Sequence, residues 1–301
     1  MAQFVNLLIL GVLAGAIYAL IATGLVVIYR ASGVLNFAQG YLLLVGAGAV
    51  WSFAAWLHLP GWLSIILGLA CAWFLGMMIE RFTVRPLLGQ PVLSTIVMTL
   101  GLSIILLGIS GWIWGTLGRG YTFKLFPTGM WYLGDINVPQ LATCSLVVTV
   151  AVLIGLQLYL GRSKSGLAMQ GVADDTQCAR SLGVKATSIL SLTWALAATV
   201  AALSGYLFGN IGGIEVMTMP MIGFKAIAAM LIGGMESLTG AILGGLLIGI
   251  CEYMTSGYLD PWLASVGWGG AMKEVSPFII LVIALLVRPY GFFGWKRIER
   301  V

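Results

Sequence analysis

Long apolar stretches alternate with short polar connections from one end of the chain to the other. Stretches of about 20 residues, the length that crosses a bilayer, and shorter ones interrupted by Gly predict transmembrane helices. Nine are expected, at residues 4–28, 36–56, 62–79, 92–117, 140–160, 188–210, 222–234, 240–256 and 275–287. Because 222–234 and 240–256 are each short, the pattern allows eight to ten spans.

The prolines agree with this division of the chain. All nine lie in predicted connections or within about a turn of a span end, where a missing backbone N–H costs least. The first apolar stretch is longer than a signal-peptide core, which favours an uncleaved first span. We expect an all-α, polytopic integral membrane protein with Gly-broken short helices, formed as one transmembrane domain over residues 1–301.

Composition excludes a soluble globule. Hydrophobic residues make up 60% of the chain and charged residues only 8%, against about 25% charged in an ordinary soluble domain. The mean hydropathy of +1.04 indicates a chain solvated mainly by lipid. The net charge of +5 does not indicate a nucleic-acid partner, because the basic residues lie singly or in small groups between apolar runs.

The basic residues predict the orientation in the membrane. With the N-terminus outside, the inner connections and the C-terminal tail hold eleven of the fifteen Lys and Arg, and the outer connections hold three. Lys225 is ambiguous. The positive-inside bias therefore places residues 161–187 and the C-terminus in the cytoplasm.

Glycine is abundant, with 41 residues, and much of it is spaced four residues apart. Small residues at this spacing let helix backbones approach closely. We expect close packing, inside the bundle or against a second membrane subunit, at Gly11 and Gly15, Gly111 and Gly115, Gly205, Gly209 and Gly213, Gly240 and Gly244, and Gly245 and Gly249. The alternative is that these glycines line a pore directly.

Two Gly-flanked polar kinks interrupt the apolar pattern, in opposite halves of the chain. Residues 33–40 join two spans with almost no loop and place two amides where a helix enters the membrane, whereas residues 233–240 separate two short apolar pieces. Such broken helices are typical of a central transport path. The alternatives are a tight turn with Asn36 as an N-cap, and Glu236 as a cap for the helix beginning near Ser237. The candidate pathway residues are polar or Gly positions in otherwise apolar spans: Gly33, Asn36, Gln39, Gly40, Thr95 and Thr99.

The predicted cytoplasmic connection, residues 161–187, contains a short capped helix. Asp174 can cap its start and Gly183 can end it, which leaves about two turns with Ala179 and Leu182 on one side. A short helix outside the membrane is suited to docking in a groove of another protein.

Motifs for other chemistry are absent from the sequence. There is no P-loop, no H-E-x-x-H, no G-x-S-x-G elbow and no Cys or His cluster, so neither an enzyme nor a metal site is expected. Glu80 lies beside Arg81 at a membrane face, while Glu236 and Glu252 lie near the ends of short spans. A stand-alone, ion-coupled secondary transporter, the rival class, would more comfortably show a carboxylate in mid-span.

Four ordered blocks of this sequence resemble the permease subunits of the branched-chain amino-acid class of bacterial ABC importers, specifically the first of the two permeases. They are residues 33–40 (GVLNFAQG), 166–183 (GLAMQGVADDTQCARSLG), 223–252 (GFKAIAAMLIGGMESLTGAILGGLLIGICE) and 288–301 (RPYGFFGWKRIERV).

The resemblance implies an inner-membrane subunit that pairs with a second, related permease and docks two cytoplasmic ATPases. It also implies an extracytoplasmic binding protein, no cofactor on this chain, and ATP with Mg on the ATPases. The substrates implied are branched-chain or other small amino acids moved inward, with urea, short amides or aromatic acids as alternatives. The residues implied to couple to the ATPases are Ala173, Asp174, Asp175, Arg180, Leu182 and Gly183.

Overall fold

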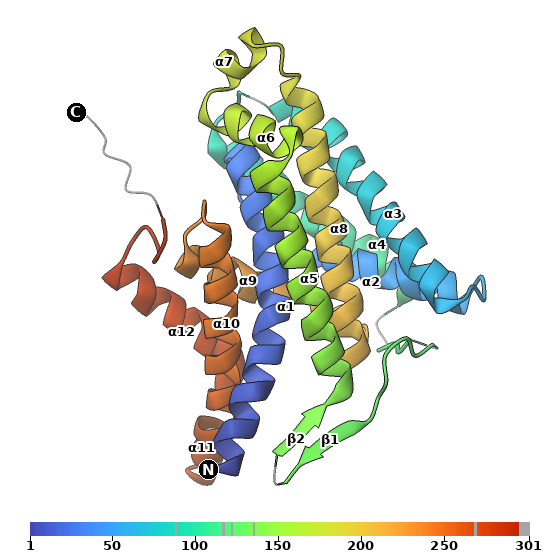
Figure 1. The fold of residues 1–301 in the computed structure, drawn as a ribbon, viewed down its shortest axis with the longest axis vertical. Coiled ribbons are helices and arrows are strands. Elements are labelled where there is room, and N and C mark those ends of the chain that lie inside the picture. The colour runs from blue at the N-terminus through green and yellow to red at the C-terminus, as the bar shows by residue number, and fades with distance from the viewer. Residues whose placement is uncertain (88, 116–117, 122, 135, 268–269, 295–301) are drawn as a thin grey trace. The chain divides into compact units, whose positions relative to one another are not determined.

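The computed structural model describes residues 1–301 except 88, 116–117, 122, 135, 268–269 and 295–301 (Figure 1). The tail residues Lys296, Arg297 and Arg300, used in the orientation argument, lie outside this part. The helices are α1 (Ala2–Ser32), α2 (Gln39–Ala55), α3 (Gly61–Ile79), α4 (Val92–Trp114), α5 (Gln140–Arg162), α6 (Lys164–Asp174), α7 (Thr176–Ser181), α8 (Ala186–Gly212), α9 (Met219–Gly233), α10 (Leu238–Met254), α11 (Asp260–Ser265) and α12 (Met272–Val287).

Each of the nine predicted spans coincides with one helix, which confirms the all-α membrane fold. Within the described residues, six helices are long and apolar enough to cross a membrane. The helices α2, α9 and α12 have 17, 15 and 16 residues. At about 1.5 Å per residue these three are shorter than a hydrocarbon core of about 30 Å. The number of full spans therefore stays a prediction.

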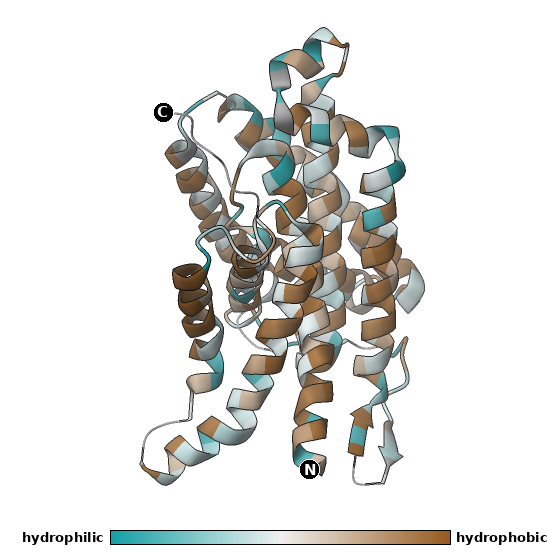
Figure 2. Ribbon diagram, turned by 60° about the vertical axis from the view of Figure 1, so that its left-hand side comes forward, coloured by the Kyte–Doolittle hydropathy of each residue, from teal (hydrophilic) through white to brown (hydrophobic). Residues whose placement is uncertain are grey.

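Hydropathy follows the helices. Figure 2 shows hydrophobic residues along most of the length of the long helices and hydrophilic residues mainly at helix ends and connections. The exposed large residues of α4 are apolar, as expected for a helix surface that contacts lipid or another membrane helix: Leu93, Val97, Leu100, Ile104, Ile105, Ile109 and Trp112.

A small β-hairpin precedes α5 and was not expected from the apolar pattern. Strands β1 (Met130–Leu133) and β2 (Ile136–Pro139) pair antiparallel, with Met130 opposite Pro139. The backbone N–H of Asn137 donates to Asn6 Oδ1 at 3.0 Å, so the hairpin is tied to the beginning of α1.

The contacts of the chain group it into two compact units. Unit 1 comprises Met1–Val26, Phe126–Val150 and Lys225–Val301, and unit 2 comprises Val27–Leu125 and Ala151–Phe224. Each unit is held by helices that approach at glycine.

In unit 2, α2, α3 and α8 pack against one another. A Cβ on Gly46 would lie 2.3 Å from Ala202 Cα, and one on Gly205 would lie 2.2 Å from Leu43 O. Real Cβ atoms do not approach this closely, so these helices need glycine at their crossing points.

In unit 1, the first half of α1 packs against α10. A Cβ on Gly249 would lie 2.3 Å from Gly15 Cα and 2.4 Å from Gly11 O, and one on Gly245 would lie 2.4 Å from Ala19 N. The predicted close packing is confirmed for these pairs and for Gly240 and Gly244, which face the end of α9.

Gly111 and Gly115 do not pack against another described helix of this chain, because a Cβ at either position would meet nothing within 4 Å. Their packing against a second membrane subunit stays a prediction. Gly115 instead has φ +73° at the end of α4, where a left-handed residue ends the helix. Gly209 and Gly213 are also not at a helix crossing: Gly209 lies beside the Tyr121 and Ile214 side chains, and Gly213 follows the end of α8.

Replacing Gly249 by Ala should destabilise the protein by about 1–3 kcal/mol, because the methyl group meets backbone atoms of α1 that cannot move aside cheaply. The matched control is Gly101→Ala in α4, where a Cβ meets nothing within 4 Å. The apparent Tm of the purified protein in detergent measures the effect. Equal Tm values for the two variants would contradict this account of the helix crossing.

Candidate functional site

The first kink breaks the helix between α1 and α2, as predicted. α1 ends at Ser32, Gly33 has φ +66°, and α2 begins at Gln39. Asn36 does not cap α2 as an N-cap residue, because the N-cap position is Ala38. The Asn36 Oδ1 atom instead accepts a hydrogen bond from the Ala38 N–H at 3.0 Å, which closes a turn just before the helix.

A buried network of amides holds this break together. Asn36 Nδ2 donates to Gln39 Oε1 at 3.1 Å, and Gln39 Nε2 donates to the Ala197 carbonyl of α8 at 3.3 Å. Thr99 Oγ1 donates to the carbonyls of Ile96 at 2.9 Å and Leu35 at 3.4 Å. Asn36, Gln39 and Thr99 are fully buried, and the network joins α2, α4 and α8 around the break.

Thr95 lies one turn before Thr99 on α4 and is also buried.

Gly40 has a different role: a Cβ there would lie 2.4 Å from Pro220 O and 3.1 Å from Gly223 Cα. The beginnings of α2 and α9 therefore touch. Two helix N-termini, each a positive end of a helix dipole, meet beside the amide network, which is an arrangement that broken helices of transporters use.

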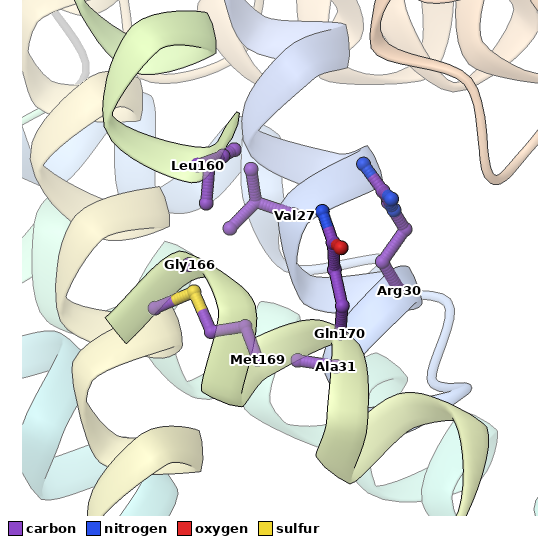
Figure 3. Close-up of a pocket in the computed structure, with 7 residues that line it drawn as sticks. All are labelled: Val27, Arg30, Ala31, Leu160, Gly166, Met169 and Gln170. Carbon is purple, nitrogen blue, oxygen red and sulfur yellow. The ribbon is translucent and has the colours of Figure 1, made fainter. Parts of the chain in front are cut away.

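A small pocket lies where the second half of α1 meets α5 and α6 (Figure 3). The side chains of Arg30 and Gln170 form its polar side, and apolar side chains form the rest. It is lined by Val27, Arg30, Ala31, Leu160, Gly166, Met169 and Gln170. The pocket is thus built partly from α6, which lies in the predicted docking segment within residues 161–187.

The docking segment consists of two short helices rather than one. Ser163 Oγ caps α6 by accepting from the Gly166 N–H at 2.9 Å. The prediction that Asp174 caps the helix is wrong, because Asp174 is the last residue of α6. Asp175 breaks the helix with φ −152° and ψ 104°, and its Oδ1 accepts from the N–H groups of Gln177 and Cys178. Asp175 is the N-cap of α7.

Gly183 ends α7, as predicted, with φ +85°. The two apolar residues of this segment do not share a face, which corrects the prediction. Ala179 is 5% exposed and packs with Val172 and Ala186, whereas Leu182 is 79% exposed. Ala173, Asp175 and Arg180 are also exposed. In Figure 1, α7 lies beyond α6 at the end of α8, so its exposed residues form a free surface of unit 2.

Two acidic residues are buried and paired with basic residues, which the sequence pattern did not show. Glu80 is fully buried and takes a two-pronged hydrogen bond from Arg85, at 3.2 and 2.9 Å. Glu252 was expected near a span end, and this is wrong, because α10 continues through a π-helical turn into α11 as one helix, Leu238–Ser265. Glu252 lies midway along it, 2% exposed, beside Lys225.

Glu236 does not cap α10, which is a further correction. The cap is Ser237, whose Oγ accepts from the Gly240 N–H at 3.0 Å. Among the residues that the structure describes, no group of three or more His, Cys, Asp or Glu side chains could hold a metal ion.

Helices suited to crossing a membrane, a buried polar break between two of them and an exposed capped segment define a multi-pass membrane permease. A family model described as "Branched-chain amino acid transport system / permease component" matches residues 7–287. The chain belongs to this family, which confirms the resemblance seen in the sequence and the expectation of a permease subunit of an ABC transporter rather than an enzyme.

Individual relatives align over almost their whole length. The chain is 30% identical to the high-affinity branched-chain amino acid transport system permease protein LivH of Escherichia coli K12, over 97% of this chain and 96% of LivH. It is 30% identical to BraD of Pseudomonas aeruginosa, over 99% of this chain and 98% of BraD. A probable LivH of Methanocaldococcus jannaschii is 28% identical over 94% of this chain and 90% of that protein.

Replacing Asn36 by Ala should destabilise unit 2, because the Ala38 N–H and Gln39 Oε1 would lose a partner in a buried place. Each unpaired group costs about 1–3 kcal/mol. The control is Asn210→Ala, a half-buried amide that donates to Tyr206 O within its own helix. Thermal unfolding in detergent compares the two, and a Tm for Asn36→Ala equal to or above that of the control would argue against a structural network at the break.

Replacing Asp175 by Ala should loosen α7, since the loss of an N-cap costs about 1 kcal/mol. Hydrogen exchange of the α7 amides should become about fivefold faster. Asp175→Asn keeps an oxygen that can cap and should exchange like the wild type, whereas equal acceleration in both variants would exclude capping as the cause.

Proposed function

We propose that this chain is the permease subunit of an ABC importer that carries branched-chain or other small amino acids inward across a bacterial inner membrane by alternating access. The family match over residues 7–287 carries the proposal, because the aligned relatives named for branched-chain amino-acid transport cover nearly the whole chain. Urea, short amides and aromatic acids are the alternative substrates within the same class of importer.

The exposed segment α6–α7 supplies the coupling. We infer that two cytoplasmic ATPases, which bind ATP and Mg, dock against Ala173, Asp174, Asp175, Arg180, Leu182 and Gly183. The exposed Leu182 gives an apolar contact and Arg180 a charge, while the caps at Asp175 and Gly183 hold the short helix rigid. A rigid segment continuous with α8 through residues 182–185 can pass a displacement to a membrane helix.

The remaining partners follow from the same class of importer. A second, related permease and an extracytoplasmic binding protein complete the assembly, with the N-terminus of this chain outside and its C-terminus in the cytoplasm. The exposed apolar side chains of α4 provide a surface for lipid or for the second permease.

The solute pathway that we propose includes Gly33, Asn36, Gln39, Gly40, Thr95 and Thr99. These amides and hydroxyls are neutral, and the present partners of Asn36, Gln39 and Thr99 lie around the break. Such groups can pass a hydrogen bond to a polar solute and take it back without leaving a charge in the membrane.

A stand-alone secondary transporter has one new observation in its favour, because Glu252 is a buried carboxylate midway along the helix Leu238–Ser265. Its charge, however, is already matched by Lys225 Nζ at 3.0 Å. The carboxylate is therefore not free to carry a coupling ion alone, and the family match favours the ATP-driven importer.

Reversing the charge of Arg180 tests the coupling. Arg180→Glu should abolish ATP-driven leucine uptake by proteoliposomes that contain the full set of subunits, because the docking surface of α7 would repel its partner. The matched control is Arg162→Glu, also exposed but at the end of α5, which should retain uptake. Both variants should insert into the membrane in normal amounts.

Normal uptake by the Arg180→Glu variant would overturn the docking assignment. Uptake by the wild type that needs no ATP and collapses with an ionophore would overturn the importer itself in favour of the secondary transporter.

A further inference from the structure

Unit 1 contains a cluster of four charged side chains and one tyrosine, which we call the charge cluster. Lys225 of α9 contacts Glu252 of α10 at 3.0 Å and Glu274 of α12 at 2.7 Å. Lys273 of α12 lies 3.8 Å from Glu252. The Tyr18 hydroxyl of α1 donates to the other oxygen of Glu252 at 2.7 Å. Four helices therefore meet at two positive and two negative charges.

The charge cluster has a buried half and an exposed half. The side chains of Lys225 and Glu252 are 6% and 2% exposed, whereas those of Lys273 and Glu274 are 37% and 61% exposed. The exposed pair comes from neighbouring positions in the first turn of α12. A buried charge is costly to leave unpaired, but a half-exposed ion pair contributes little. The α12 half can therefore leave at small cost, while the buried pair must stay matched.

The two halves are complementary in a specific way. The α12 half presents one carboxylate to Lys225 and one ammonium to Glu252, side by side. An α-amino acid at neutral pH presents the same two groups on one carbon atom. If a zwitterion replaced Lys273 and Glu274, then Lys225 would still face two carboxylates and Glu252 would still face two ammonium groups. The net charge of the cluster would not change.

We propose that Lys225 and Glu252 form a binding site for the charged groups of a zwitterionic amino acid, and that Lys273 and Glu274 occupy it when substrate is absent. The α-carboxylate binds Lys225, and the α-ammonium binds Glu252, which Tyr18 orients. This inference rests on the proposed function and deepens it, because it names the chemical class that the membrane subunit itself recognises.

A site formed by Lys225 and Glu252 distinguishes zwitterionic amino acids from other solutes. A lone cation would match Glu252 but leave Lys225 with one partner fewer, and a lone anion would do the reverse. Urea and short amides carry neither charge and would leave both positions unfilled once α12 withdrew. Among these solutes, only one that carries both charges replaces the α12 half completely.

The test uses two double variants in the complete importer, each of which removes one positive and one negative charge together. Lys225→Met with Glu252→Gln removes the proposed site, and Lys273→Gln with Glu274→Gln removes the internal competitor. The control is Glu80→Gln with Arg85→Gln in unit 2, an ion pair between a buried carboxylate and a part-exposed guanidinium. Leucine, leucinamide and 4-methylpentanoate serve as probes. Leucinamide lacks the carboxylate of leucine, and 4-methylpentanoate lacks its ammonium group.

Binding is measured on the purified complex without its binding protein, and uptake is measured in proteoliposomes. We expect the Lys273→Gln/Glu274→Gln complex to bind leucine at least fivefold more tightly than wild type, and to bind leucinamide and 4-methylpentanoate no better. We expect the Lys225→Met/Glu252→Gln complex to lose leucine uptake at least tenfold while remaining monodisperse. The control pair should leave leucine affinity as in the wild type.

Unchanged leucine affinity in the Lys273→Gln/Glu274→Gln complex overturns the proposal, and this result needs no variant of the buried pair to fold. Wild-type leucine uptake by a folded Lys225→Met/Glu252→Gln complex also overturns it. In both cases ATP-driven leucine uptake by the wild type would still support the proposed function. A wild-type complex that carries urea but not leucine would instead overturn the proposed substrate, and with it the site.

Discussion

The hydrocarbon core of a bilayer supplies no water to a polar group, and every polar group placed there must find its partner in protein. The break between α1 and α2 shows how this chain meets that demand. Where the helical ladder stops, Asn36 binds the freed Ala38 N–H, Gln39 binds Asn36, and the Ala197 carbonyl of α8 takes the last donor. A neighbouring helix thus supplies the final partner of the polar groups at the break.

The same lack of water changes what holds helices together. Lipid is as apolar as the side chains, so burial of apolar surface does not drive one membrane helix against another, and close backbone contact does. The crossing of α1 and α10 has this character, since Gly11 and Gly15 face Gly245 and Gly249 at distances that admit no side chain. The crossing of α2 with α8 at Gly46 and Gly205 repeats the solution in the other unit.

The sequence was informative where a property is local, and less so where it depends on neighbours. Each of the nine predicted apolar runs coincides with a helix, because hydropathy is a property of the segment itself. Gly11 and Gly15 have the same spacing as Gly111 and Gly115, yet only the first pair lies at a crossing within the described chain. Spacing places two glycines on one face but cannot say whether another helix lies against that face.

In the candidate site, too, local features were predicted and features that depend on neighbouring residues were not. The kinks and the end of α7 at Gly183 were predicted, because glycine with positive φ is a local signal. The N-cap was placed one residue early, since Asp174 and Asp175 are chemically identical and only the backbone angles of Asp175 distinguish them. Glu252 was misplaced because the apolar run ends near residue 256, whereas the helix itself continues to Ser265.

Both proposed transport sites depend on partners that can be exchanged. The neutral hydrogen bonds of the Asn36 network can pass to a polar solute without leaving a charge in the membrane. The charge cluster is half open, because the buried Lys225 and Glu252 share partners with two exposed residues of one helix turn. An unmatched buried charge is costly, so Lys225 and Glu252 can release Glu274 and Lys273 only when another carboxylate and another ammonium group replace them. A zwitterionic amino acid carries both groups. The cost of an unpaired charge therefore selects, at this position, for a zwitterionic solute.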